Sequence, residues 1–181
     1  MKREFLTVSN LLSIFRALLS IPFALVMLLP AVPLRSWATG ILLLGALTDK
    51  LDGDIARWRN EVTEWGKILD PLADKICVTV MSLVLLKLGD MPLWFVAALL
   101  SRDLLILAGG MYLKSSRGVV LPSNLTGKWT ATIIAFTILM LLMNVLPEAK
   151  PILLAACTAG LLVSFVLYVA RFLGVLREAG T

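Results

Sequence analysis

Four aspartates stand in two close pairs beside long apolar runs of the chain. Asp49 and Asp52 are three residues apart, and Asp70 and Asp74 are four residues apart. On helices, both spacings place the two carboxylates of a pair on one face, roughly 5–6 Å from each other. Each like-charge contact then costs on the order of 3 kcal/mol at an effective dielectric constant of about 20. The arrangement therefore requires a cation.

The cation that suits these side chains is a hard divalent metal ion. The chain has no histidine, and its two cysteines, Cys77 and Cys157, lie within apolar stretches. An all-oxygen donor set favours Mg²⁺ or Mn²⁺ over zinc or copper. Two such ions about 3.5–4 Å apart can hold the attacking and leaving oxygens of a displacement at phosphorus. The aspartates thus predict metal-dependent phosphoryl transfer, in which the protein mainly positions groups and neutralises charge.

Small residues and one arginine accompany the aspartates. Gly53 and Ala56 follow the first pair at helical spacing, and Gly66 lies one turn before Asp70. They leave bare helix surface against which a flat ligand could lie, while the planar fork of Arg57 suits two phosphate oxygens. The small residues are equally typical of close helix packing in membranes, and Arg57 is equally typical of a cytoplasmic anchor. Both interpretations stay open.

The composition indicates an integral membrane protein. The chain has 181 residues, of which 59% are hydrophobic, and its mean hydropathy is +0.92; soluble domains are about 45–50% apolar. Runs of ~20 apolar residues are long enough to cross a bilayer as helices. They lie at about 9–30, 36–56, 66–88, 91–113, 126–146 and 150–175. We expect an all-α polytopic protein with six transmembrane helices, in which 1–181 form one domain and 1–8 a short interfacial segment.

The distribution of lysine and arginine predicts the orientation, because these residues are enriched in cytoplasmic loops. Eight of them fall on one side of the six-crossing arrangement: Lys2, Arg3, Arg57, Arg59, Lys67, Lys114, Arg117 and Arg177. The opposite loops contain Arg35, Lys87 and Lys150. We therefore expect both termini and the aspartates at the cytoplasmic face of the cell membrane. The net charge of +5 suits anionic lipid head groups and gives no case for nucleic acid.

Residues 49–74 read D-x2-D-G-x2-A-R-x8-G-x3-D-x3-D, a pattern that resembles the motif of the CDP-alcohol phosphotransferase family. The stretch from Val8 to Arg16 also resembles the N-x-L-T-x-x-R opening of bacterial members. Within the family, the sequences of residues 69–75 and 122–128 are most similar to those of phosphatidylglycerophosphate synthase.

This resemblance implies a six-helix membrane enzyme of phospholipid biosynthesis, commonly a homodimer. Such an enzyme transfers a phosphatidyl group from CDP-diacylglycerol to an alcohol and releases CMP. The resemblance also implies roles for individual residues. Asp49, Asp52, Asp70 and Asp74 would ligate two Mg²⁺ or Mn²⁺ ions, with Asp74 also the catalytic base. The CDP site would be lined by Asp49, Asp52, Gly53, Ala56, Arg57 and Gly66.

The acceptor that we expect is glycerol 3-phosphate, whose phosphate needs a cationic pocket. Arg102, Arg117, Lys128 and Arg171 are the candidates. Arg102 could instead pair with its neighbour Asp103, and long basic side chains can also extend to the membrane interface without binding a ligand. Inositol phosphate, serine and phosphatidylglycerol are alternative acceptors within the family.

Two other classes of protein are compatible with aspartates in membrane helices. Intramembrane prenyltransferases hold a diphosphate through Mg²⁺, but they lack the Gly-x2-Ala-Arg element and generally have more crossings. An ion-conducting protein would place ionisable groups along its path, whereas the four aspartates here are all expected near one membrane face. Both classes fit the sequence less well than a phosphatidyltransferase.

Overall fold

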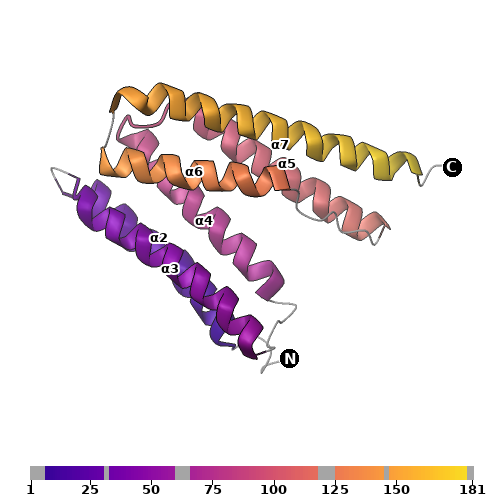
Figure 1. Ribbon diagram of the computed structural model, residues 1–181, viewed down its shortest axis with the longest axis horizontal. Helices are drawn as coiled ribbons and strands as arrows, with labels where there is room; N and C mark the ends of the chain where they lie inside the picture. Colours follow the sequence, from indigo (N-terminus) through magenta and orange to yellow (C-terminus); the bar gives the residue numbers. More distant parts are fainter. Residues whose placement is uncertain (1–6, 31–32, 60–65, 118–124, 145–146, 179–181) are drawn as a thin grey trace. The chain divides into compact units, whose positions relative to one another are not determined.

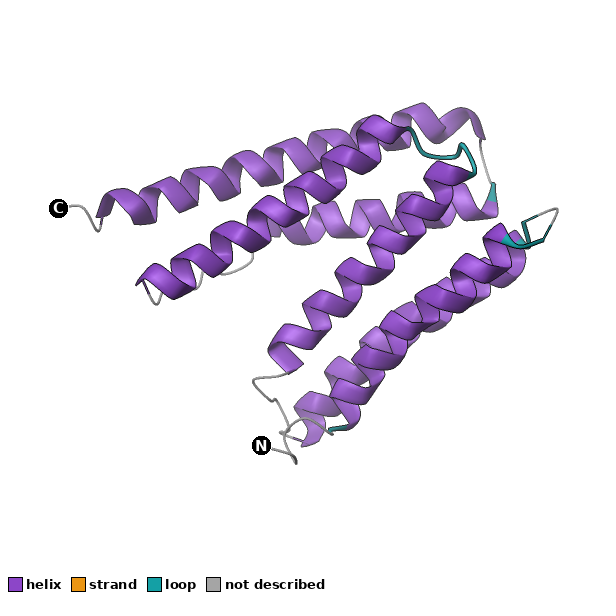
Figure 2. Ribbon diagram, turned by 180° about the vertical axis from the view of Figure 1, so that it is seen from behind, coloured by secondary structure: helices purple, strands orange, loops and turns teal. Residues whose placement is uncertain are grey.

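The protein is all-α in the residues that its computed structural model describes, which are 7–30, 33–59, 66–117, 125–144 and 147–178. These residues form six α-helices and one short 3-10 helix and contain no strand (Figures 1 and 2). The elements are α2 (Val8–Leu28), α3 (Arg35–Arg59), α4 (Gly66–Lys87), α5 (Leu93–Arg117), α6 (Leu125–Met143), η1 (Pro147–Ala149) and α7 (Lys150–Glu178). The chain divides into two compact units, Met1–Asp90 and Met91–Thr181.

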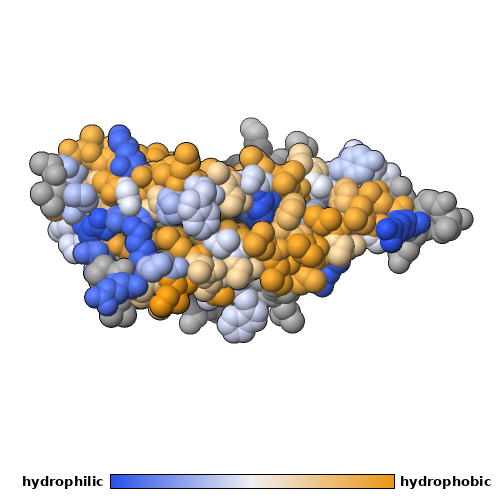
Figure 3. Space-filling view, turned by 90° about the horizontal axis from the view of Figure 1, so that it is seen from above, coloured by the Kyte–Doolittle hydropathy of each residue, from blue (hydrophilic) through white to orange (hydrophobic). Residues whose placement is uncertain are grey.

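The six predicted apolar runs coincide with the six helices, which confirms the all-α expectation. By length and apolar composition, three described stretches could cross a membrane: Asn10–Leu28, Leu93–Leu113 and Lys150–Arg177. A shorter apolar stretch, Gly127–Met143, lies in α6. Large apolar side chains are exposed on these helices (Figure 3), such as Ile152 at 71% and Leu93 at 67%. Hydrocarbon rather than water is the solvent that suits such a surface.

In the first unit, α2 packs along both α3 and α4, and α2 and α3 lie side by side (Figure 1). The helix begins after Thr7, whose hydroxyl oxygen accepts a hydrogen bond from the Asn10 amide at 3.3 Å. Phe23 and Met27 are buried on α2. An ion pair of 2.7 Å between Arg35 and Asp90 joins the beginning of α3 to the turn after α4. These contacts fix the two ends of the unit.

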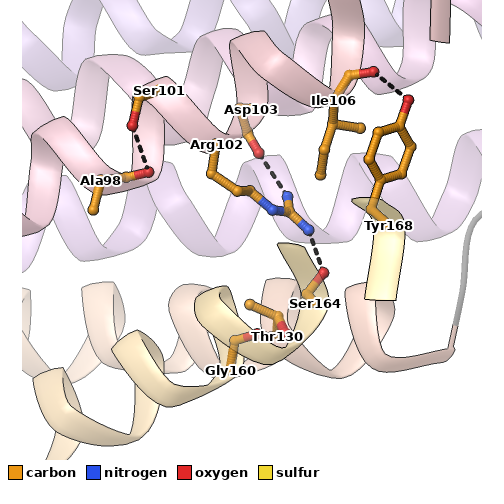
Figure 4. A network of polar contacts seen from close by, with 9 residues as sticks. All are labelled: Ala98, Ser101, Arg102, Asp103, Ile106, Thr130, Gly160, Ser164 and Tyr168. Atoms are coloured by element: carbon orange, nitrogen blue, oxygen red, sulfur yellow. Dashed lines mark hydrogen bonds and ion pairs between the residues drawn. The ribbon is translucent and has the colours of Figure 1, made fainter. Parts of the chain in front are cut away.

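In the second unit, α7 packs on both α5 and α6. A Cβ added at Gly109 of α5 would lie 3.0 Å from the Tyr168 hydroxyl oxygen, and that hydroxyl donates a hydrogen bond of 2.9 Å to the Ile106 carbonyl (Figure 4). On the α6 side, the Thr130 hydroxyl donates to the Gly160 carbonyl at 3.0 Å. Small residues thus let these helices approach closely.

Replacing Gly160 by valine should lower the unfolding temperature in detergent. A Cβ there would lie 3.2 Å from the Thr130 hydroxyl oxygen, and overpacking of this kind costs about 1–3 kcal/mol. The matched control is Gly174→Val on the same helix, where a Cβ would meet nothing within 4 Å. Equal unfolding temperatures for the two variants would contradict the close packing of α6 against α7.

Candidate functional site

Asp70 and Asp74 lie one turn apart near the beginning of α4, as their spacing predicts. The Asp74 side chain is 55% exposed, and Asp70 is half-buried. An exposed carboxylate next to a partly buried one is accessible to a ligand while still being positioned by the protein.

Two side chains from α2 contact these carboxylates. The Ser13 hydroxyl donates a hydrogen bond to Oδ1 of Asp70. Nε of Arg16 lies 3.4 Å from Oδ1 of Asp74, and the Arg16 side chain is only 5% exposed. Both residues lie in the stretch from Val8 to Arg16 that resembles the opening of bacterial family members, but neither was predicted to belong to the site. Their polar character at a spacing of three residues in an apolar run was the signal that could have identified them.

Arg16 lies where α2 meets both neighbouring helices. Its carbonyl accepts a hydrogen bond of 3.2 Å from the Cys77 thiol of α4. A Cβ added at Gly45 of α3 would lie 4.0 Å from Cγ of Arg16. Gly45 is one helical turn before Asp49. The chain itself therefore supplies part of the positive charge that the clustered aspartates require.

The remaining members of the predicted site lie on the same two helices. Asp49, Asp52, Gly53, Ala56 and Arg57 are in α3, and Gly66 is the first residue of α4. Their side chains lie outside the described part of the structure, so their convergence on Asp70 and Asp74 stays a prediction. Among the described side chains, no group of three or more metal-ligating residues occurs.

The described donors fit a hard divalent cation. Asp70 and Asp74 offer carboxylate oxygens only, which are the ligands that Mg²⁺ and Mn²⁺ prefer. One Asp70 oxygen accepts from Ser13, and this kind of outer hydrogen bond commonly orients a metal-binding carboxylate. The chemistry of the donor set is thus compatible with a metal ion held by this pair and the α3 aspartates.

The candidate acceptor-binding cations all belong to the second unit. Nη1 of Arg102 lies 2.6 Å from Oδ1 of Asp103, and Nη2 donates to the Ser164 hydroxyl oxygen at 2.5 Å (Figure 4). The pairing of Arg102 with Asp103, which the sequence left open, is therefore observed. Lys128 and Arg171 are exposed, and the side chain of Arg117 lies outside the described part. Their role in an acceptor pocket remains a prediction.

The chain is similar to proteins of one family over nearly its whole length. Residues 6–176 match the family model described as CDP-alcohol phosphatidyltransferase. The chain is 39% identical over 124 residues to "Putative cardiolipin synthase" of Mycobacterium tuberculosis, covering 68% of this chain and 58% of that protein. It is 36% identical over 115 residues to CDP-diacylglycerol–glycerol-3-phosphate 3-phosphatidyltransferase of Bacillus subtilis, covering 61% and 58%.

A human relative matches over a shorter stretch. Cardiolipin synthase (CMP-forming) of Homo sapiens is 38% identical over 78 residues, covering 42% of this chain and 26% of that protein. The chain thus spans less than two thirds of the length of each of these relatives.

Ser164→Ala should destabilise the protein, because it removes an acceptor from the Arg102 guanidinium within a pair of apolar helices. Ser164 is 1% exposed, and the loss of a buried hydrogen-bond partner costs about 1–3 kcal/mol. Ser101→Ala is the control, since that exposed hydroxyl bonds only to the Ala98 carbonyl one turn earlier. Thermal unfolding in detergent measures both; a control that loses as much stability as Ser164→Ala would show that the contact with Arg102 is not responsible.

Proposed function

The chain belongs to the CDP-alcohol phosphatidyltransferase family, and we propose that it transfers a phosphatidyl group from CDP-diacylglycerol to an alcohol and releases CMP. Members of this family use divalent metal ions. The observation that carries the proposal is the Asp70–Asp74 pair, which occupies the last two positions of the family motif and lies on one face of α4 in contact with α2. Phospholipid synthesis is the process to which this activity belongs.

Each member of the motif has a role in the proposed reaction. Asp49, Asp52, Asp70 and Asp74 would hold two Mg²⁺ or Mn²⁺ ions, which supply charge neutralisation at the diphosphate. Arg57 would bind phosphate oxygens, while Gly53, Ala56 and Gly66 would leave room for the CDP group.

Asp74 would act as the base for the acceptor. Its carboxylate is the more exposed of the α4 pair, so an acceptor hydroxyl can approach it. In the proposed step, the acceptor oxygen bonds to the phosphorus that carries the lipid, the bond from that phosphorus to CMP breaks, and the hydroxyl proton passes to Asp74. Nε of Arg16 lies 3.4 Å from Oδ1 of this carboxylate.

Glycerol 3-phosphate is the acceptor that we propose. One support is the sequence of residues 69–75, which resembles that of phosphatidylglycerophosphate synthase. The other is the Bacillus subtilis relative, whose name specifies glycerol 3-phosphate. Phosphatidylglycerol is the second candidate, because the mycobacterial and human relatives are named as cardiolipin synthases. Of the four candidate cations for an acceptor phosphate, Lys128 and Arg171 are exposed, whereas Arg102 is engaged by Asp103 and Ser164.

We propose a single integral membrane domain over 1–181 that assembles as a homodimer, with both termini and the aspartates at the cytoplasmic face. The apolar stretches in α2, α5 and α7 support membrane insertion, and the excess of lysine and arginine in one set of loops supports the orientation. A cytoplasmic site would give CDP-diacylglycerol access from the bilayer and a water-soluble acceptor access from the cytoplasm.

Asp70→Asn and Asp74→Asn should each abolish CMP release from CDP-diacylglycerol in detergent with Mg²⁺ and glycerol 3-phosphate. Asparagine keeps the shape of the side chain but removes the charge that binds the metal. Asp90→Asn is the control, because Asp90 follows the opposite end of α4 and pairs with Arg35. Near-normal turnover in either α4 variant, with unfolding as cooperative as in the parent protein, would contradict the assignment.

A panel of acceptors should identify the substrate. The purified protein with CDP-diacylglycerol and Mg²⁺ should release CMP fastest with glycerol 3-phosphate, compared with phosphatidylglycerol, inositol phosphate and serine, each in a separate reaction. A preference for phosphatidylglycerol would establish cardiolipin synthesis instead. Release of pyrophosphate from a prenyl diphosphate, without CMP release from CDP-diacylglycerol, would overturn the proposed reaction itself.

A further inference from the structure

One face of α2 is polar and buried. Asn10 and Ser13 are fully buried, and Arg16 and Ser20 are each 4% exposed. Their spacing of three, three and four residues places them on one side of the helix. Apolar side chains at these positions would pack α2 against its neighbours equally well, whereas buried polar groups are costly unless they are hydrogen-bonded. We therefore looked for the groups on neighbouring helices with which these buried polar side chains interact.

The partner on α4 is the aspartate pair, and the two helices meet in register. Ser13 contacts Asp70 across 57 residues of chain, and Arg16 contacts Asp74. Both helices advance by about one turn between the first contact and the second, so α2 and α4 run parallel here. Each carboxylate thus meets its own polar side chain from α2.

The same helix also positions α3. In the described part of the chain, α3 and α4 each pack along α2 and contact one another much less. The Arg16 side chain lies beside Gly45 of α3, and Gly45 is one turn before Asp49 in the sequence. The relative placement of the two aspartate-bearing helices therefore depends on the α2 face that carries Ser13 and Arg16.

We propose that Ser13 and Arg16 are positioning residues for the metal site, an inference that rests on the proposed function. The Ser13 hydroxyl fixes the orientation of the Asp70 carboxylate, and the other carboxylate oxygen would be available to a metal ion. The Arg16 guanidinium offsets the repulsion between Asp70 and Asp74 while no metal is bound. The first effect strengthens metal binding by orienting a ligand, and the second weakens it, because a fixed positive charge repels a dication.

Mn²⁺ binding to the purified, substrate-free protein tests the Ser13 role, with the electron paramagnetic resonance signal of free Mn²⁺ as the readout. Loss of an outer hydrogen bond to a metal ligand typically weakens binding about 10–100-fold, and we expect Ser13→Ala to do so. Ser13→Thr keeps the hydroxyl and should restore the affinity. Ser20→Ala is the matched control on α2, because its buried hydroxyl donates to the Ala17 carbonyl of its own helix at 2.6 Å.

The Arg16 role predicts a change of the opposite sign. Arg16→Gln should bind Mn²⁺ several-fold more tightly than the parent protein and show a larger rise of unfolding temperature when Mn²⁺ is added. Arg16→Lys keeps the charge and should stay close to the parent in both measurements. A general loss of structure would not strengthen metal binding, so this readout separates charge compensation from a merely structural role.

Failure of the inference is distinct from failure of the proposed function. If Ser13→Ala and Ser20→Ala bind Mn²⁺ equally, or if Arg16→Gln binds it no more tightly than Arg16→Lys, the corresponding positioning role is overturned even when the parent protein releases CMP. If the parent protein binds Mn²⁺ but releases no CMP with any acceptor, the proposed reaction fails while the measured roles of the α2 residues stand.

Discussion

The repulsion between the carboxylates of Asp70 and Asp74, one turn apart on α4, is the constraint on which the site in the first unit depends. Like charges about one helical turn apart are unfavourable, and more so where apolar surroundings limit screening. Arg16 of α2 lies next to Asp74 and offsets part of this repulsion. In the proposed function, metal ions and the arginine of the motif would supply the remaining positive charge. A site built in this way is partly compensated before any ligand arrives and still attractive to dications.

The second unit follows a different rule, because several polar side chains on its long apolar helices find their partners within the unit. Arg102 is engaged by Asp103 and Ser164, Tyr168 by the Ile106 carbonyl, and Thr130 by the Gly160 carbonyl. Three of these contacts join α7 to α5 or α6. Polar side chains here hold helices together in an environment where burial of apolar surface against lipid supplies little driving force.

The family relationship and the chemistry of the site concern different parts of the reaction. In the proposed reaction, the motif and the metal ions that it would hold act on the CDP end of the donor. The names of similar chains specify either glycerol 3-phosphate as the acceptor or cardiolipin synthesis. Function in such a family therefore has to be argued from the side chains of the site rather than from the common fold.

The sequence by itself determined the membrane character, the six helices and the pairing of Asp70 with Asp74 on one face, because these follow from composition and from spacing within a single helix. It also offered the contact between Arg102 and Asp103, which are adjacent in the chain, as one of two alternatives for Arg102. Only the tertiary structure joined Ser13 to Asp70 and Arg16 to Asp74. These contacts cross between α2 and α4, and no periodicity within either helix specifies which turn of one helix faces which turn of the other. That register is set by the packing of whole helices.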